Sequence, residues 1–254
     1  MAPLRTPFQG LWNVVRFNWH FYLVALGVAL VLAAAAAVAP AEVRGYVGLL
    51  AALVLVPVLI SLAVSAYVYD FANLYRLGWL PAPESARPAL LTVNAGFDEI
   101  SAALAARYPL GTLLALDFYD PARHTEVSIR RARRAYPPYP STRPVDARGT
   151  LPLPDQSIDL AVAFLAAHEI RDAAERAAFF GEIRRVTRPD GRVVVVEHLR
   201  DPANFLAYTV GFLHFHSRSA WLATFGAAGL LVEREVPVTP FITAFILRPN
   251  GSAA

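Results

Sequence analysis

Two long apolar stretches near the start of the chain contrast with the more mixed pattern that follows. Residues 17–41 and 46–69 carry no formal charge and are apolar on every helical face. A helix needs about 20 residues to cross the core of a bilayer, and each stretch is at least that long. The pattern therefore predicts two transmembrane helices joined by a short turn, because a buried helical hairpin of a soluble fold would keep one polar face.

The charges around this hairpin predict its orientation. The turn between the helices is too short to hold a domain, so both ends of the hairpin lie on one side of the membrane. Positive residues favour the cytoplasmic side, and the side with the two ends carries more of them, namely Arg5, Arg16, Arg76 and Arg87 against Arg44 alone. We expect a multi-pass membrane protein in contact with the lipid bilayer, with both termini and the domain that follows the hairpin in the cytoplasm.

A proline pair marks the predicted end of the membrane part. Residues 70–80 are mostly apolar and predict an interfacial segment, and Pro81-Ala82-Pro83 follows directly. The expected organisation is a membrane anchor over residues 1–80 and a second domain over residues 81–254.

From residue 88 onward, short apolar runs alternate with amphipathic helical patterns. Repetition of strand, helix and strand predicts an α/β fold with a parallel sheet and crossover helices. The final helix and two strands predict an antiparallel closing pair. Expected strands cover 89–93, 112–116, 158–164, 193–197, 231–236 and 241–247, and expected helices cover 99–107, 122–135, 172–186 and 217–228.

The amino-acid composition limits the kinds of functional site that the chain can form. The 254 residues contain no cysteine, which excludes disulfides, thiolate metal sites and a cysteine nucleophile. The formal charge of +3 comes with no nucleic-acid motif, so we expect no nucleic-acid partner. The densest charge cluster, residues 130–134, predicts a solvated helix face or a contact with anionic headgroups.

Several motifs of the second domain resemble class I S-adenosylmethionine-dependent methyltransferases, and most closely the methyltransferase type 11 and quinone C-methyltransferase group. Residues 90–99 stand in the place of the family's first motif, and Leu116-Asp117 resembles the acidic end of its second strand. Asp146 with residues 151–155 resembles the adenine-side loop, and residues 182–192 resemble the helix and turn before the fifth strand. The resemblance covers roughly residues 88–249 and implies a Rossmann-like, seven-stranded methyltransferase sheet behind the transmembrane hairpin.

The same resemblance implies a cofactor site for S-adenosylmethionine. Nucleotides bind at the carboxyl ends of the central strands of such sheets, where Gly96 would admit the cofactor and Asp117 would accept hydrogen bonds from its ribose. Asp98 either caps the following helix or pairs with the cofactor's ammonium. The other expected contacts are Asp146, with Ala147 beside it, at the adenine, and Phe118 at the ring or in the core.

The first motif departs from the family pattern. Thr92 replaces the usual acid, Asn94 replaces a glycine or alanine, and Asp98 replaces the last glycine. These changes favour an alternative in which the domain is catalytically degenerate and serves as a membrane-tethered nucleotide-binding or scaffold protein.

Candidate catalytic residues follow the fourth and fifth predicted strands. Methyl transfer mainly needs alignment of donor and acceptor, with a base where the acceptor loses a proton. His168 and Glu169 are the first candidates, and Glu197 and His198 are the second. A metal is not expected, because the closely spaced His214 and His216 show no third ligand in the sequence; each histidine alone also fits a structural hydrogen bond.

Together these features predict a membrane-anchored S-adenosylmethionine-dependent methyltransferase. Because an anchor confines the site to the plane where lipophilic molecules concentrate, the expected acceptor is a lipophilic small molecule such as a quinone, phenol or isoprenoid lipid. The position of the site relative to the bilayer is the only basis for this substrate class.

Overall fold

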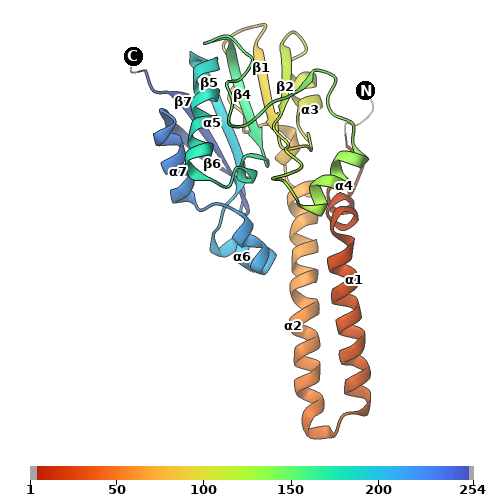
Figure 1. Ribbon diagram of the computed structural model, residues 1–254. Helices are drawn as coiled ribbons and strands as arrows, with labels where there is room; N and C mark the ends of the chain where they lie inside the picture. Colours follow the sequence, from red (N-terminus) through yellow and green to blue (C-terminus); the bar gives the residue numbers. More distant parts are fainter. Residues whose placement is uncertain (1–4, 252–254) are drawn as a thin grey trace.

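Two long helices project from a sheet that is covered by shorter helices (Figure 1). The computed structural model describes residues 5–251. Helix α1 spans Gln9–Val38 and α2 spans Ala41–Ala66, and the two pack side by side as a hairpin. Both helices are long and apolar enough to cross a membrane, and most of their apolar side chains are exposed. They begin earlier in the chain than expected, because the helical backbone continues beyond the uncharged stretch at the start of α1.

Seven strands form one sheet in the order β3-β2-β1-β4-β5-β7-β6. All neighbouring strands are parallel up to β5, and β7 pairs antiparallel with both β5 and β6. The predicted fold class is confirmed. The strands are β1 (Ala89–Asn94), β2 (Thr112–Asp117), β3 (Thr142–Pro144), β4 (Ile158–Phe164), β5 (Thr187–His198), β6 (Leu230–Thr239) and β7 (Ile242–Pro249).

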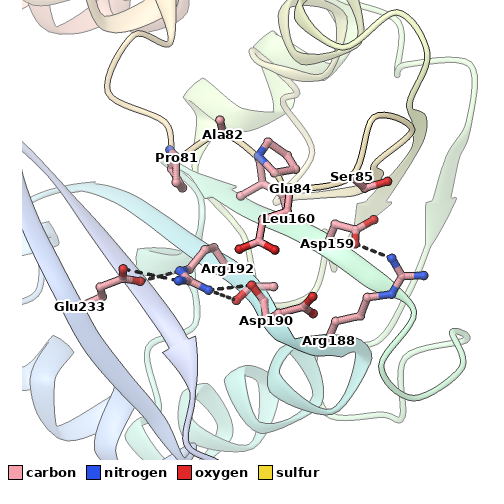
Figure 2. A pocket seen from close by; sticks show the side chains of 12 residues that line it. Pro81, Ala82, Glu84, Ser85, Asp159, Leu160, Arg188, Asp190, Arg192 and Glu233 are labelled. Atoms are coloured by element: carbon pink, nitrogen blue, oxygen red, sulfur yellow. Dashed lines mark hydrogen bonds and ion pairs between the residues drawn. The ribbon is translucent and has the colours of Figure 1, made fainter.

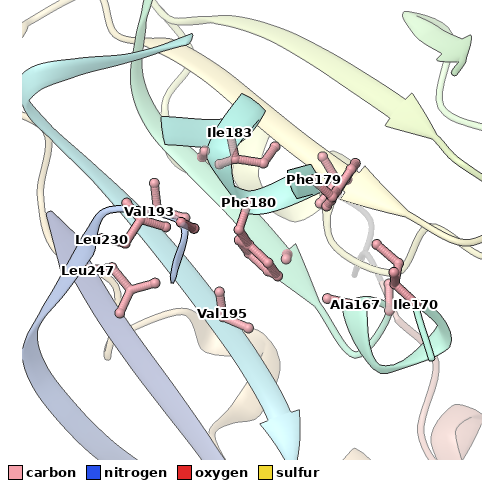
Figure 3. Packing of buried hydrophobic residues seen from close by; sticks show 14 of the residues in the cluster. Ala167, Ile170, Phe179, Phe180, Ile183, Val193, Val195, Leu230 and Leu247 are labelled. Carbon is pink, nitrogen blue, oxygen red and sulfur yellow. The ribbon is translucent and has the colours of Figure 1, made fainter. Parts of the chain in front are cut away.

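One face of the sheet packs against α5 (Ala173–Val186) and α7 (Arg218–Ala227). Phe179 and Phe180 of α5 are almost fully buried against Val193 and Val195 of the sheet, as Figure 3 shows. Each helix begins where the sequence supplies a cap: the Asp172 carboxylate accepts from the Glu175 amide, and Ser217 accepts from the Ala220 amide. Burial of these aromatic side chains is the main stabilisation of this layer.

The opposite face is covered by α3 (Ser101–Arg107) and by the segment that leaves the hairpin. This segment contains η1 (Tyr67–Phe71) and η2 (Leu74–Arg76). We expected an interfacial segment here, but Leu74, Leu77 and Leu80 are buried in the core with Leu104 of α3. An apolar stripe beside a membrane helix is equally suited to covering an open sheet, and contact of this segment with the membrane interface stays a prediction.

Three further elements differ from the sequence prediction. Helix α4 covers Val127–Ala135 and begins five residues later than expected, because Asp120 and His124 close a turn through two hydrogen bonds. Strand β3 has only three residues and was missed. The sequence also gave no indication of α6 (Pro202–Tyr208) and η4 (Thr209–His214) between β5 and α7, or of η3 (Ala167–Glu169) after β4.

Candidate functional site

The carboxyl ends of the parallel strands face the hairpin. Tyr69, just beyond α2, places its hydroxyl 2.9 Å from Nε2 of His198 at the end of β5. Phe17 of α1 packs edge-on against Phe97, which follows β1. In Figure 1 the two long helices leave the sheet from this edge. The order of strands reverses between β1 and β4, so this edge also contains the switch point where nucleotide sites occur in such folds.

The loop after β1 carries two buried polar atoms without partners. Gly96 has a left-handed backbone (φ 95°), which a glycine adopts without strain. Asn94 accepts the Gly96 amide with Oδ1 at 3.0 Å, and Asp98 accepts the Ser101 amide with Oδ1 at 2.9 Å at the start of α3. Within residues 5–251, Nδ2 of Asn94 and Oδ2 of Asp98 are buried without a hydrogen-bond partner. This loop therefore offers one free donor and one free acceptor.

The Asp117 carboxylate at the end of β2 is held by two groups. Oδ1 accepts the Tyr119 amide at 3.0 Å, and Oδ2 accepts from the guanidinium of Arg133. Arg133 comes from α4 and lies over the Tyr119 ring, with its guanidinium carbon 4.4 Å from the ring centroid. A Cβ added at Gly96 would lie 2.8 Å from Cδ of Arg133. The arginine thus lies between Gly96 and Asp117, two of the predicted cofactor residues.

A hollow of about 360 Å³ continues from Asp117 toward the neighbouring loop. Phe118, Asp146 and Ala147 line it, so the structure brings these predicted residues together. Phe118 also packs against Phe179, with ring centroids 5.3 Å apart, and is buried in the core. Asp146 accepts the Arg148 amide at 2.9 Å, and hydrogen bonds and charge from exposed Arg148 lower the pKa of Asp146 below its ordinary value.

His168 and Glu169 lie on η3, directly after β4, and face the end of β5. Nδ1 of His168 is 2.7 Å from Oε2 of Glu197, and the His168 amide donates to Oε1 of the same carboxylate at 3.1 Å. Burial alone would lower the pKa of His168, but Glu197 and Glu169 outweigh it and raise the pKa to about 10. Hydrogen bonds from His168 and His214 hold the pKa of Glu169 below its ordinary value despite burial. Three of the four predicted catalytic residues therefore form one charged cluster.

His198 is enclosed away from this cluster. Its Nδ1 lies 3.0 Å from Oδ1 of Asn204, and its Nε2 faces the Tyr69 hydroxyl. Because an amide oxygen only accepts, Nδ1 carries the proton and Nε2 accepts from Tyr69. Burial lowers the pKa of His198 to about 4, so the ring is neutral near pH 7. Both ring nitrogens are engaged, and the residue connects the end of the hairpin to the sheet.

Sequence reasoning missed Arg133 and Asn94 as members of the site. We expected the arginine run at 130–134 to be solvated or to contact lipid headgroups, yet Arg133 reaches Asp117 and Arg131 donates to the Phe17 carbonyl of α1 at 2.6 Å. No signal in the sequence separates Arg131 and Arg133 from the other arginines of this run, because the pattern does not mark any of them as inward. Asn94 was noted only as a departure from a motif.

A second hollow, of about 400 Å³, lies at the opposite edge of the sheet. Figure 2 shows that ion pairs close it, between Arg188 and Asp159 and between Arg192 and Glu233. None of the predicted site residues lines it. Its position at the amino ends of β4 and β5 argues against a nucleotide site, because such sites form at the carboxyl ends.

Comparisons with known proteins agree with the fold. Residues 91–196 match the family described as methyltransferase domain. The chain is similar to the structure of an O-methyltransferase family 2 protein from Planctomyces limnophilus in complex with apigenin, with 16% identity and a TM-score of 0.52 over 81% of this chain and 69% of that chain. It is also similar to an S-adenosylmethionine-dependent methyltransferase from Aquifex aeolicus, with 14% identity and a TM-score of 0.48 over 75% and 97% of the two chains. None of the curated proteins compared with the sequence matches it.

Proposed function

We propose that this chain, whose residues 91–196 match a methyltransferase domain, is a membrane-anchored S-adenosylmethionine-dependent methyltransferase acting on a lipophilic small molecule. The observation that carries the proposal is the pair of unpartnered polar atoms beside Gly96. A buried polar group without a hydrogen bond costs about 1–3 kcal/mol, and these two lie together beside Gly96 at the carboxyl edge of the sheet, where one ligand would satisfy both.

The residues of the loop fit the amino-acid end of the cofactor. Nδ2 of Asn94 is a donor suited to a carboxylate, and Oδ2 of Asp98 is an acceptor suited to an ammonium. Asp98 thus combines the two roles that its sequence position suggested, because its other oxygen already holds the start of α3. Gly96 leaves room for the ligand to approach the backbone.

The nucleoside end fits the next part of the same edge. Asp117 would accept from the ribose hydroxyls, and the hollow lined by Phe118, Asp146 and Ala147 would take the adenine. Arg133 now pairs with Asp117, and about two fifths of the arginine side chain is exposed. The Asp117 carboxylate is buried and Arg133 is the exposed partner of this pair, so the arginine can turn outward to solvent when the ribose takes its place on the carboxylate.

The bound cofactor would supply an electrophilic methyl group, and the protein would supply alignment and charge. His168 and Glu169 lie past the end of β4, next to the switch point, where an acceptor would meet the donor. His168, held by Glu197 from behind and positively charged near pH 7 because its pKa is about 10, would orient the acceptor oxygen or carbon and stabilise negative charge there, and a proton that the acceptor loses would pass to solvent. His198, with both nitrogens engaged, would act only by holding the hairpin in place.

The apolar surface around this edge supports a lipophilic acceptor. Segment α6–η4 lies beside α2 in Figure 1, at the hairpin side of the sheet. It exposes Phe205, Leu206, Val210 and Leu213, the last three by more than half. An apolar patch continuous with two membrane-crossing helices would rest in the bilayer interface. The proposed topology places the hairpin turn across the membrane and the catalytic domain in the cytoplasm.

Calorimetric titration of the purified full-length chain with S-adenosylhomocysteine tests the cofactor site. We expect micromolar binding that weakens at least tenfold in Asp98→Asn and in Asp117→Asn. Asp190→Asn, an exposed aspartate at the opposite edge of the sheet, is the matched control and should bind unchanged. Transfer of a labelled methyl group to a membrane-lipid extract then tests the acceptor class.

The alternative is a degenerate domain that serves as a membrane scaffold. The Arg133 side chain between Gly96 and Asp117 favours it, since a permanent ion pair would fill the cofactor position. Absence of binding in both the natural chain and Arg133→Met would establish this alternative, and binding followed by turnover would exclude it.

A further inference from the structure

A cluster of imidazole and carboxylate groups at the acceptor side of the crevice is arranged as a metal site. We propose that His168, Glu169 and His214 bind a divalent cation of the zinc class. The two histidines come from different turns, η3 and η4, that the fold brings together. The site goes beyond the proposed function, and only its role toward the acceptor rests on that function.

The spacing of the ligand atoms suits a tetrahedral ion. Oε1 of Glu169 lies 3.4 Å from Nε2 of His168 and 3.3 Å from Nε2 of His214. One ligand atom from each residue lies within 4.8 Å of the other two. Zinc binds nitrogen and oxygen at about 2.0–2.2 Å in a tetrahedron, which separates neighbouring ligands by about 3.4 Å. The three groups would therefore need only small shifts to close on an ion.

Both histidines already have the outer partners that metal-binding histidines use. Nδ1 of His168 is 2.7 Å from Glu197, and Nδ1 of His214 is 3.2 Å from Glu126. A carboxylate on one ring nitrogen fixes the orientation of the ring and leaves the other nitrogen to bind the metal. In each ring here, Nε2 is the nitrogen that faces Glu169. Two independent carboxylate–histidine pairs aimed at one oxygen are hard to explain by packing alone.

The ligand-bearing turns are also tied to each other. The Arg171 guanidinium donates to the His168 carbonyl at 3.3 Å and to the His214 carbonyl. Glu197 is fully buried, whereas His214 keeps about a third of its side chain exposed. The buried Glu197 thus fixes the His168 ring from the interior, and the metal position remains accessible from solvent on the side of His214.

Three protein ligands leave the fourth position of a tetrahedral ion open. Sites of this composition bind water or substrate there, and the ion lowers the pKa of the bound group. Under the proposed function, an acceptor hydroxyl in that position would be held as its anion beside the methyl donor. The expected ligand class is therefore an oxygen-bearing acceptor such as a phenol or a reduced quinone.

Zinc titration of the metal-free full-length chain against a chromogenic chelator tests the site without any activity measurement. We expect one zinc ion per chain, bound at micromolar or lower concentration. His168→Ala and His214→Ala should each weaken binding at least 100-fold. Glu197→Gln, which keeps the shape of the side chain but removes the charge behind His168, should weaken it about 10- to 100-fold.

His20→Gln, a histidine of α1 outside the cluster, is the control and should bind zinc as the natural chain does. Thermal unfolding of each variant checks that it is folded, and Glu169→Gln replaces any alanine variant that is not. Failure to bind stoichiometric zinc at 100 µM, or binding unaffected by loss of either histidine, would overturn the proposal. Zinc binding without binding of S-adenosylhomocysteine would instead overturn only the proposed function.

Discussion

At the residue scale, the site depends on a few polar atoms whose partners come from distant parts of the chain. Asp117 ends β2 where the sequence predicts it, but its carboxylate is shared with Arg133 of α4. His198 also follows a predicted strand, yet Tyr69 and Asn204 enclose it. The chemistry of each residue is therefore set by neighbours that its own motif does not contain.

Replacing Arg133 with methionine should strengthen binding of S-adenosylhomocysteine. The substitution keeps much of the side-chain volume but removes the ion that competes for Asp117. A fully exposed ion pair contributes about 0.2–1 kcal/mol, and this pair has a buried carboxylate, so the dissociation constant should fall by at least about two- to fivefold in a calorimetric titration. Arg130→Met on the same helix, an exposed arginine, should have no effect. Weaker binding in Arg133→Met would mean that the arginine contacts the cofactor itself.

The stability of the chain should fall in acid because of His198. Its pKa is about 4 in the folded chain and about 6.5 when unfolded, so the unfolded state binds the extra proton between these values. The contribution of His198 to the free energy of unfolding is fully present above about pH 6.5. It decreases as the pH falls toward 4, by about 3 kcal/mol in total. Urea unfolding in mild detergent, followed by tryptophan fluorescence, measures this loss.

His198→Gln removes the titrating group and should show a shallower dependence on pH over the same range. Equal slopes for the two proteins between pH 7 and pH 4 would show that His198 is not held neutral by the fold.

At the element scale, the start of α1 is joined closely to η1, the segment whose Tyr69 hydroxyl contacts His198 of the sheet. The Asp70 carboxylate, just beyond α2, accepts the amides of Gly10 and Leu11 at 2.7 and 2.8 Å. These are the free amides at the start of α1, so the end of one hairpin arm caps the beginning of the other. A Cβ added at Gly10 would lie 2.3 Å from Cβ of Tyr69. The glycine is required for this close approach.

Gly10→Ala should therefore loosen the hairpin from the sheet. Relief of the clash moves Tyr69, whose hydroxyl binds His198, and overpacking of this kind costs about 1–3 kcal/mol. Limited proteolysis in detergent should cut between the hairpin and the sheet faster than in the natural chain. Gly27→Ala in the same helix is the control, since a Cβ there meets no atom within 4 Å. Identical cleavage rates in both variants would contradict the proposed attachment.

At the scale of the whole molecule, the crevice and the hairpin belong to one edge of the sheet. The carboxyl ends of the strands, the exposed apolar residues of α6–η4, the start of α1 and the end of α2 all lie there. An enzyme so arranged would keep its acceptor side against the bilayer. The orientation of the hairpin in the membrane is the property of this arrangement that is easiest to test.

Single cysteines can report on each side of the membrane, because the natural chain contains none. Glu42→Cys places a cysteine in the first turn of α2, next to the hairpin turn, and Ser85→Cys places one beyond the other end of the hairpin. On intact cells a membrane-impermeant maleimide should label only the cysteine at position 42, and on lysed cells it should label both. Labelling of the two positions from the same side would exclude a spanning hairpin.

The sequence alone determined the elements whose signal is local. Two uncharged stretches longer than a bilayer core predicted the long helices, alternation of apolar runs predicted the sheet, and Asp98 and Asp117 were placed from motif positions. Only the tertiary structure decided that residues 74–80 cover the sheet, that Arg133 occupies the crevice and that His168, Glu169 and His214 converge. The physical reason is that long-range contacts depend on which elements meet in space. The period of apolar residues along a helix or strand determines which of its faces is buried, but it does not determine which other element packs against that face.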